Sequence, residues 1–488
     1  MRWTLCLLLA SLWPAAAHAA VFHVDDASDR RRQTGLSDPC LCLSTADTCT
    51  LRAAIETANV CLGFDEVHLD HPGPYVLDRV GSFENAAFTG DLDVIEDVRV
   101  VATVGNQIDA PNLHDRIFHV PQIRGSGTAL TLDGVTLTRG HAPPGRNGGC
   151  VLVEYGRLEM VGSSAYLCEA ASGGAIALTS SPASIRTTQL LNDTADLGGA
   201  IYVEDSELVL FQTIVSSNEA TDGGGVYATG SEALIVEESA IRDNTAFRAG
   251  GGLWIEAPTT TLRSQIRDNF AEYAGAALIY RTTLTGTETD VFDNASMRDG
   301  AGLYGHDASR IELDHSSLYG NVSPRAGGAI YTRSLVYLYN VTVHDNEAAT
   351  GPALYGASAS FAYANNASIA ENVPTFGLGT AYGIDAPLVR LRNTVVENNG
   401  DDCSSGVSSL GHVVSPSAAC LAGGASGNTQ AFAATAALTI GSTRYLTLVT
   451  SSPAVDAGDN ASCESDDQRF VARPQGSACD VGSWELEP

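Results

Sequence analysis

A repeat of about 25 residues constrains the fold of this chain more than any other feature of its sequence. Each repeat opens with two small residues, mostly glycines, and the first of each pair lies at positions 148, 173, 198, 223, 250, 275, 300, 327 and 351. Successive starts are 24 to 27 residues apart. A period in this range is typical of a solenoid, in which each repeat buries its apolar face against the next.

The interior of one repeat indicates the kind of solenoid. Within residues 198–222, three short apolar segments occur at 200–204, 207–211 and 213–217, each followed by turn residues. Three strands per repeat are what one coil of a parallel β-helix requires. Helical repeats would space apolar residues by three and four and would contain little glycine, whereas this chain has 49 glycines. The sequence therefore predicts an all-β fold, a right-handed parallel β-helix.

A second register consists of asparagines 25 to 27 residues apart: Asn218, Asn244, Asn269, Asn294, Asn321 and Asn346. Stacked amides can donate and accept along the helix axis, so we expect a structural ladder that satisfies buried polar groups. The alternative is a row of ligand-binding amides.

Strand alternation predicts which side chains face inward. The third residue after the first small residue is always aliphatic, as expected of a buried file: Ile201, Val226, Leu253, Leu278, Leu303, Ile330 and Leu354. The next residue should face outward and is aromatic in six of seven coils, with an interruption at Ile279: Tyr202, Tyr227, Trp254, Tyr304, Tyr331 and Tyr355. Two interpretations remain open for this row. The rings stack on one another and cover the sheet, or they form a platform that binds a glycan chain.

The N-terminus predicts the compartment. Arg2 precedes an apolar run at residues 5–12, and Ala17-His18-Ala19 forms a small-residue exit. This is the pattern of a secretory signal peptide cleaved after Ala19 or Ala20, the alternative being an uncleaved anchor. No later segment approaches the roughly 20 apolar residues of a membrane span. We expect a secreted, extracellular or cell-surface protein without a transmembrane segment, and a monomer.

Cysteine usage agrees with export. Eleven cysteines are present, and loss of Cys6 with the signal leaves ten, an even number. Closeness in sequence predicts five disulfides: Cys42 with Cys49, Cys40 with Cys61, Cys150 with Cys168, Cys403 with Cys420, and Cys463 with Cys479. No Cys and His spacing is typical of a zinc site.

The charge balance restricts the ligands. The chain has 57 acidic and 27 basic residues, a net charge of −30. Such a field disfavours nucleic acid and anionic membranes. Anionic polymers such as pectate are disfavoured as well, unless Ca²⁺ bridges them to the acids. No cofactor is predicted, with Ca²⁺ as the remaining possibility.

The two ends of the solenoid need caps, because terminal coils expose core and strand edges. Residues 49–59 predict a short helix with Leu51, Ile55 and Ala58 on one face, suitable as a lid. A segment rich in Gly, Ala and Ser at 404–437 is expected to pack along the last coil. The expected organisation is a signal peptide at 1–20, an N-terminal cap at 21–70, the β-helix at 71–400 and a disulfide-containing C-terminal cap at 401–488.

Several segments resemble known families. CTLRAAIETAN (49–59) resembles the CSLREA-type segment of bacterial exported β-helix proteins, and GDLDV (90–94) and DRIFHV (115–120) are similar to stretches that precede their repeats. SPAVDAGDN (452–460) and CDVGSWE (479–485) are similar to the terminal region of the choice-of-anchor type Q family.

These resemblances have consequences for fold and export. DQRFVARPQG (467–476) also resembles that terminal region, but Phe470 stands where a glycine is usual. The repeats resemble those of polymorphic outer-membrane proteins and the pectin-lyase-like superfold, which hosts lyases, hydrolases, adhesins and scaffolds. Relatives often continue into a sorting anchor, whereas here three residues follow Glu485. The resemblance thus implies release or non-covalent retention at the surface.

Candidate catalytic groups are few. A β-helix lyase needs clustered acids for Ca²⁺ and a basic residue, and a hydrolase needs carboxylates about 5–9.5 Å apart. The candidates are Asp91 with Asp93, and Asp401 with Asp402 near His412. Both pairs also suit ordinary turns.

The sequence favours secreted or cell-surface recognition of a glycan or another cell surface by an extended scaffold. The alternatives are a polysaccharide lyase or glycoside hydrolase of the pectin-lyase-like class, and a passive structural element. Three or more acids, or acids with an arginine, in one groove would favour the enzyme.

Overall fold

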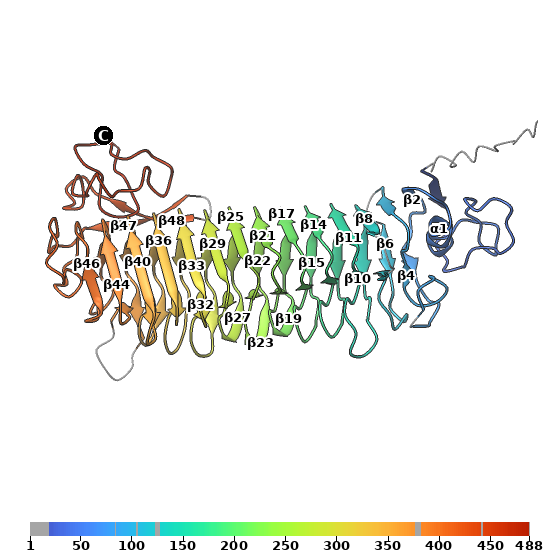
Figure 1. Ribbon diagram of the computed structural model, residues 1–488, viewed down its shortest axis with the longest axis horizontal. Helices are drawn as coiled ribbons and strands as arrows, with labels where there is room; N and C mark the ends of the chain where they lie inside the picture. The colour runs from blue at the N-terminus through green and yellow to red at the C-terminus, as the bar shows by residue number, and fades with distance from the viewer. Residues whose placement is uncertain are drawn as a thin grey trace, which may run out of the picture.

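The chain winds into a right-handed parallel β-helix with coils of about 26 residues, which confirms the predicted fold class. The computed structural model describes residues 19–82, 84–103, 106–122, 127–375, 382–440 and 443–487. Residues 1–18, most of the predicted signal peptide, lie outside the described part. Figure 1 shows the coils stacked along one long axis, with the N-terminal helix at one end and the C-terminal segment beside the coils at the other.

Three long parallel sheets form the walls of the described solenoid. The first has 15 strands: β1 (Val21–Val24), β2 (Asp65–Leu69), β5 (Val98–Ala102), β8 (Ala129–Asp133), β11 (Arg157–Val161), β14 (Ala183–Arg186), β17 (Leu208–Phe211), β21 (Leu234–Glu237), β25 (Thr259–Leu262), β29 (Thr283–Thr287), β33 (Arg310–Asp314), β36 (Leu335–Tyr339), β40 (Phe361–Asn365), β44 (Val389–Arg392) and β46 (Val407–Ser409). The second has 12 strands: β4 (Leu92–Asp93), β7 (Phe118–Val120), β10 (Val151–Glu154), β13 (Ile176–Thr179), β16 (Ile201–Glu204), β20 (Val226–Thr229), β24 (Leu253–Ile255), β28 (Ala277–Tyr280), β32 (Leu303–His306), β35 (Ile330–Thr332), β39 (Leu354–Gly356) and β43 (Ile384–Asp385). The first sheet continues beyond residue 400 through β46, so coiling extends into the region expected to form the C-terminal cap.

The third long sheet and three short ones complete the described strands. The third has 13 strands: β3 (Tyr75–Val76), β6 (Gln107–Asp109), β9 (Thr136–Thr138), β12 (Ser164–Tyr166), β15 (Gln189–Leu191), β18 (Ile214–Ser216), β22 (Ala240–Arg242), β26 (Gln265–Arg267), β30 (Asp290–Phe292), β34 (Ser317–Tyr319), β37 (Thr342–His344), β41 (Ser368–Ala370) and β45 (Val395–Glu397). The short sheets comprise β19 (Glu219–Asp222), β23 (Thr245–Ala249), β27 (Phe270–Tyr273) and β31 (Ala295–Ser296), then β38 (Glu347–Ala348) with β42 (Val373–Pro374), and the antiparallel pair β47 (Thr435–Ile440) and β48 (Thr443–Leu448).

The aliphatic file of the 12-stranded sheet points into the core, with one correction to the predicted register. The predicted residues are buried and paired in line, except that Ala277, not Leu278, lies between Leu253 and Leu303. The reason is Ala274, which adopts the positive φ (56°) that glycine supplies in neighbouring coils, such as Gly250 (69°). Counting glycine pairs therefore placed this coil one residue late. Because a shift of one residue reverses the face of every side chain, Leu278 faces outward and Ile279 inward.

The asparagine ladder has the structural role that the sequence predicted. Each amide nitrogen donates to the amide oxygen one coil further on, over 2.7 to 3.0 Å. The ladder continues beyond the predicted asparagines through Asn372 to Asn399. All of these amides are buried, so the ladder satisfies polar groups that water does not reach.

The N-terminal end is closed by helix α1 (Leu51–Ala58), whose eight residues are all buried. The Thr50 side chain caps the helix by accepting from the Ala53 amide. Arg52 is fully buried. Its guanidinium pairs with Asp29 and donates to the carbonyl oxygens of Gly90 and Asp91, which ties the lid to the first coils.

The C-terminal segment folds back along the 13-stranded sheet instead of packing only along the last coil. Gln468 accepts a hydrogen bond from Thr342 on β37, and Asp466 pairs with His315 beside β34. Strand β48 contacts β34 and β37. This arrangement covers part of the 13-stranded sheet and leaves the outer face of the 12-stranded sheet on another side of the solenoid.

Disulfides join all five cysteine pairs that the sequence predicted, with Cα separations of 4.9 to 6.7 Å. Two of them hold the N-terminal cap, one the repeat region and two the C-terminal part. Among the residues that the structure describes, no helix is both long enough and apolar enough to span a membrane.

Candidate functional site

Residues at one register position form a continuous file along the outer face of the 12-stranded sheet. Direct strand pairing places the following residues in a single outward file: Asp93, His119, Leu152, Ala177, Tyr202, Tyr227, Trp254, Leu278, Tyr304, Tyr331, Tyr355 and Asp385. The file begins in a charged region, passes through two small or aliphatic residues and continues as an aromatic row. A ligand that lay along this face would therefore contact charged groups at one end and aromatic rings further along.

The aromatic row, defined as Tyr202, Tyr227, Trp254, Tyr304, Tyr331 and Tyr355, is stacked along the helix axis. Tyr227 and Trp254 have ring centroids 5.4 Å apart and planes 15° apart, and Tyr304 and Tyr331 are 4.4 Å and 3° apart. Tyr304 and Tyr331 are only 6% and 7% exposed. The rings thus turn their faces to one another rather than to solvent. This geometry agrees with mutual stacking of the rings, and binding of a glycan chain by the row stays a prediction.

The row is interrupted at Leu278, and a cavity lies there. This gap cavity has a volume of about 620 Å³, and its walls include Trp254, Leu278 and Tyr304. Because Leu278 is not aromatic, neither Trp254 nor Tyr304 has a ring from this row stacked on it across the gap. Their strands are two spacings apart, about 10 Å, and Leu278, which is 6% exposed, lies on the strand between them.

Polar side chains border the gap cavity. Glu256 accepts hydrogen bonds from the Trp254 indole nitrogen at 2.9 Å and the Tyr227 hydroxyl at 3.3 Å, which fixes both rings. The Arg248 guanidinium lies 5.7 Å from the Trp254 ring centroid. Together with His306 and Arg333 on the same wall, these groups surround an aromatic cleft with donors and acceptors, a composition suited to small polar ligands with apolar faces.

The other end of the file holds a buried cluster of charged groups. This acid–histidine cluster consists of Asp91, Asp93, Asp115, Arg116, His119 and Glu154. Arg116 donates to Asp91 at 3.0 Å. The imidazole of His119 lies 3.0 Å from Asp93 through Nδ1 and 3.2 Å from Glu154 through Nε2. Backbone contacts hold the cluster from behind, since the Ala87 amide donates to Asp93.

Burial sets the protonation of this cluster. Desolvation, reinforced by the charges of Asp93 and Asp115, raises the pKa of Asp91 to about 7. Burial alone would lower the pKa of His119, but its hydrogen bonds to Asp93 and Glu154 raise it to about 9. The hydrogen bond from His119 lowers the pKa of Glu154. Near neutral pH the cluster therefore combines a carboxyl group able to hold a proton, a cationic imidazole and an ionised carboxylate.

A cavity of about 380 Å³ opens on this cluster, and Asp91, Arg116, His119 and Glu154 all line it. The Nε atom of Arg116 is buried and has no hydrogen-bond partner among the described residues. The arrangement meets the condition that would favour an enzyme, several acids with an arginine in one groove. Carboxyl groups whose pKa values are driven apart are a common arrangement for general acid and base catalysis.

The two candidate pairs named from the sequence have different surroundings in the structure. It brings Asp91 and Asp93 together as expected, and adds four partners that sequence reasoning missed. Asp401 is exposed. Asp402 caps the asparagine ladder, because its Oδ1 accepts a hydrogen bond from the backbone nitrogen of Asn399 at 2.8 Å. His412 contacts the Ala457 carbonyl at 2.7 Å, so its contact is with the C-terminal segment rather than with the two aspartates. The signal that could have found the cluster is the register, because alignment of Leu92 with Phe118 places Asp93 beside His119.

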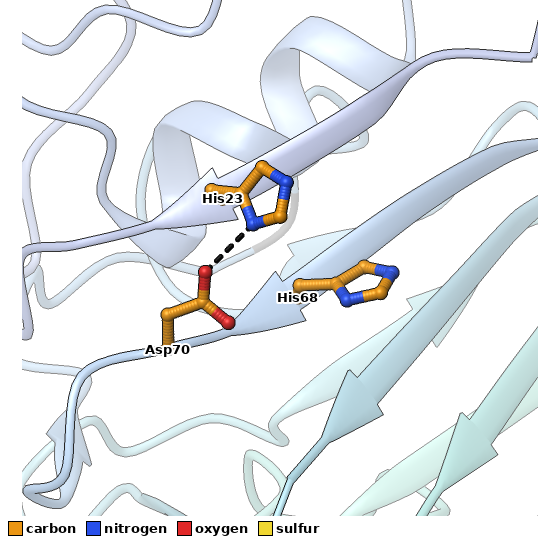
Figure 2. A group of neighbouring side chains, drawn as sticks. All are labelled: His23, His68 and Asp70. Atoms are coloured by element: carbon orange, nitrogen blue, oxygen red, sulfur yellow. Dashed lines mark hydrogen bonds and ion pairs between the residues drawn. The ribbon is translucent and has the colours of Figure 1, made fainter.

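A group with metal-binding chemistry lies on a different face. His23 on β1 and His68 on β2 are direct register partners in the 15-stranded sheet, and His23 Nδ1 is 2.7 Å from Asp70. Figure 2 shows the two imidazoles and the carboxylate turned toward one side of these strands. Their ligand atoms lie within 4.8 Å of one another, which would allow a transition metal to draw them together.

The acid–histidine cluster also contains a possible ligand set, Asp91, Asp93 and His119. There, however, Arg116 already supplies a cation 3.0 Å from Asp91, and the raised pKa of His119 favours its protonated form, which has no lone pair for a metal. These two charges disfavour Ca²⁺ at this place. The group at His23 is therefore the better fit for a metal among the described residues.

Comparisons with known proteins provide little beyond this geometry. No family model matches the sequence, and no curated protein matches it. Among solved structures, the chain is similar to the crystal structure of pectate lyase Pel9A, with a TM-score of 0.36 and 11% identity over 97% of this chain and 98% of that chain. The resemblances to CSLREA-type and choice-of-anchor proteins are not confirmed by a family match.

Proposed function

We propose that this protein is exported and binds an extended glycan chain along the outer face of its 12-stranded sheet. The observation that carries the proposal is the gap cavity, where the aromatic row is interrupted at Leu278 and both Trp254 and Tyr304 line one opening. The five disulfides support an oxidising, extracellular location.

Sugar rings suit this opening because they combine apolar C–H faces with a rim of hydroxyl groups. A pyranose in this opening would place an apolar face against the partly exposed Trp254, with the nearly buried Leu278 and Tyr304 behind it. Hydroxyl groups at its rim would meet Glu256 and His306. Stacking of this kind needs no net charge, which agrees with a chain whose net charge of −30 repels polyanions. The preferred ligand is thus a neutral glycan.

The length of the file favours a polymer over a single sugar. A further cavity of about 520 Å³ lies at its C-terminal end, lined by Tyr355 and Asp385. Three cavities along one file of one sheet provide successive contact points for a linear chain, whereas a monosaccharide would use only one of them. Binding at several weak sites raises the overall affinity without a deep pocket.

A second candidate function, hydrolysis of a bound glycan, is favoured by the acid–histidine cluster. Asp91, with its pKa near 7, is suited to donate a proton to a glycosidic oxygen. Glu154 remains ionised and lines the same cavity, where it is suited to activate water or to stabilise a developing positive charge. In this view the aromatic row holds the polymer and the cluster cleaves it.

The proposals are tested by a glycan array on the secreted protein, followed by reducing-sugar and unsaturated-product assays on neutral and acidic polysaccharides. We expect binding to neutral glycans. If hydrolysis occurs, Asp91→Asn and Glu154→Gln should abolish reducing-sugar release while binding persists. Unsaturated products would instead indicate a lyase, and absence of binding to every glycan on the array would contradict the recognition proposal.

A further inference from the structure

A buried aspartate near the N-terminus is left incompletely paired. Asp65, the first residue of β2, has no exposed surface. Its Oδ1 accepts a hydrogen bond from the backbone nitrogen of Ala20 at 2.8 Å. Its Oδ2 is buried and has no hydrogen-bond partner among the described residues, and no ion pair found in that part of the chain includes Asp65. A buried carboxylate in this state is costly unless a cation neutralises it or it takes up a proton, and burial raises the pKa of Asp65.

The nitrogen of Ala20 is held firmly beside this carboxylate. Ala20 directly precedes β1, and its carbonyl oxygen accepts from the Glu66 amide at 2.8 Å. Two hydrogen bonds to neighbouring residues of β2 therefore fix both sides of Ala20. The residue before it, Ala19, ends the small-residue exit Ala17-His18-Ala19, where secretory signal peptides are cleaved.

We propose that cleavage of the Ala19–Ala20 bond creates the missing cation, so that the new N-terminal ammonium forms a buried ion pair with Asp65. Hydrolysis breaks the amide bond: water supplies a hydroxyl group to the carbonyl carbon of Ala19, and the Ala20 nitrogen leaves as an amine. That amine takes up a proton at neutral pH. The nitrogen 2.8 Å from Oδ1 thereby changes from an amide with one hydrogen to an ammonium with three, and can also satisfy Oδ2.

The same geometry distinguishes the two cleavage sites that the sequence left open. Cleavage after Ala20 would remove the nitrogen that contacts Asp65. The buried carboxylate would then lose the hydrogen-bond donor at Oδ1 and gain no cation from that nitrogen. Cleavage after Ala19 keeps this nitrogen and gives it a charge. The ion pair thus selects Ala20 as the first residue of the mature protein, and it couples export to completion of the N-terminal edge of the 15-stranded sheet.

The ion pair predicts a raised pKa for the N-terminal amine. An unperturbed α-amino group has a pKa of about 7.7–8.0, and a buried carboxylate beside it favours the charged form and raises that pKa. The chain contains no lysine, because all 27 of its basic residues are arginines. The α-amino group is therefore the only amine of the mature protein, and an amine-reactive ester reports on it alone.

The experiment begins with secretion of the full chain, followed by intact mass and N-terminal sequencing. The secreted protein is then labelled with an amine-reactive ester between pH 7 and 9, both folded and unfolded in denaturant. We expect Ala20 as the first residue, labelling at least tenfold slower in the folded protein at pH 7.5, and an amine pKa above 8. Cleavage at any other bond, or equal labelling of folded and unfolded protein, would overturn the proposal.

Two variants separate the ion pair from simple burial of the amine. Asp65→Asn should label several times faster than the parent, whereas Asp70→Asn, which changes an exposed acid nearby, should not change the rate. If Asp65→Asn does not fold, a protein released by a site-specific protease so that it begins at Ala19 serves instead. Its displaced amine should label at close to the unfolded rate, and its thermal midpoint should be lower. Parent rates in Asp65→Asn and in the Ala19 form would contradict the pair, whatever the outcome of the glycan experiments.

Discussion

The outward file of the 12-stranded sheet is stabilised by different interactions at its two ends. Near the N-terminus the file position is occupied by Asp93 and His119, and further along by rings such as Tyr331. Asp93, His119, Tyr304 and Tyr331 are buried although they lie on the outside of the sheet, and the other four rings of the row are half-buried. The first is held by ion pairs and hydrogen bonds, and the second by stacked rings.

The difference shows what fixes chemistry along a solenoid. The inward file remains apolar in both regions, including Phe118 between Leu92 and Val151, whereas the outward file only has to satisfy its neighbours one coil away. A charged residue is acceptable there if the next coil supplies a counter-charge, as His119 does for Asp93. An aromatic residue is acceptable if the next coil supplies a ring. Leu278 supplies neither, and a cavity results.

The largest effect is expected from removal of the counter-charge. Arg116→Ala removes the guanidinium that pairs with Asp91 and Asp115 and leaves His119, 3.8 Å from Asp91, as the remaining cation of the cluster; loss of one partner of a buried pair costs about 3–5 kcal/mol. Urea unfolding, followed by circular dichroism, measures the loss. The control Arg157→Ala, at an exposed position on the neighbouring 15-stranded sheet, should change stability by less than about 0.5 kcal/mol. Equal effects of the two variants would show that the cluster is not a stabilising unit.

A slightly smaller effect is expected in the aromatic row. Tyr331 is stacked on both faces, by Tyr304 and Tyr355, so Tyr331→Ala should destabilise by about 3 kcal/mol through loss of burial and of two ring contacts. Tyr355→Ala, at the end of the row, loses one stacked partner and should cost clearly less. Comparison of the two urea midpoints is the measurement. If the end residue matters as much as the middle one, stacking does not account for the stability of the row.

The pH dependence of stability should separate the two regions. The pKa of Asp91 is raised from 3.8 to about 7 and that of His119 from 6.5 to about 9, so the folded state binds more protons than the unfolded state. The stability contributed by each group is complete below its unfolded pKa and is lost as the pH rises through its folded pKa. The urea midpoint should therefore fall between pH 5 and pH 9.

Asp91→Asn provides the test of this pH dependence, because asparagine mimics the protonated acid. It should flatten the part of the curve around pH 7, whereas the exposed control Asp401→Asn should leave the curve unchanged. A midpoint that rises with pH in the parent would mean that the cluster is ionised when folded.

A modest effect is expected on glycan binding. Trp254→Ala removes one wall of the gap cavity and should weaken binding by about 1–2 kcal/mol, by analogy with aromatic anchors at interfaces. Tyr202→Ala serves as the control, because Tyr202 belongs to the same row but does not line this cavity. Titration of both variants with a glycan that binds the parent gives the comparison, and equal weakening would remove the special role of the gap.

Much of this architecture could be predicted from the sequence because a solenoid repeats its rules at a fixed period. The glycine pairs, the asparagine ladder and the aliphatic file each depend on contacts between neighbouring coils, which a constant spacing reveals. The prediction was one residue wrong at Leu278 because Ala274 takes a backbone conformation that usually requires glycine. Strand alternation predicted that the aromatic residues face outward. It did not predict the side-chain angles that turn the ring faces to one another.

The acid–histidine cluster was harder to predict for a different reason. Its residues lie in the first, irregular coils, where no glycine pair marks the register, and Asp91 is 63 positions from Glu154 in the chain. Only the pairing of β4, β7 and β10 brings these groups together. The return of the C-terminal segment along β34 and β37 likewise depends on contacts more than a hundred residues apart, such as His315 with Asp466.

The most direct test of the recognition proposal is to close the gap in the aromatic row. Leu278→Tyr restores the ring that the coils on either side possess, at an outward position where Leu278 is 6% exposed and packs in one cluster with Tyr304. The measurement is a glycan array with the parent and Leu278→Tyr, both checked for equal thermal stability. The account predicts that the variant loses the glycans that the parent binds, by tenfold or more. Unchanged binding by a stable Leu278→Tyr protein would contradict it.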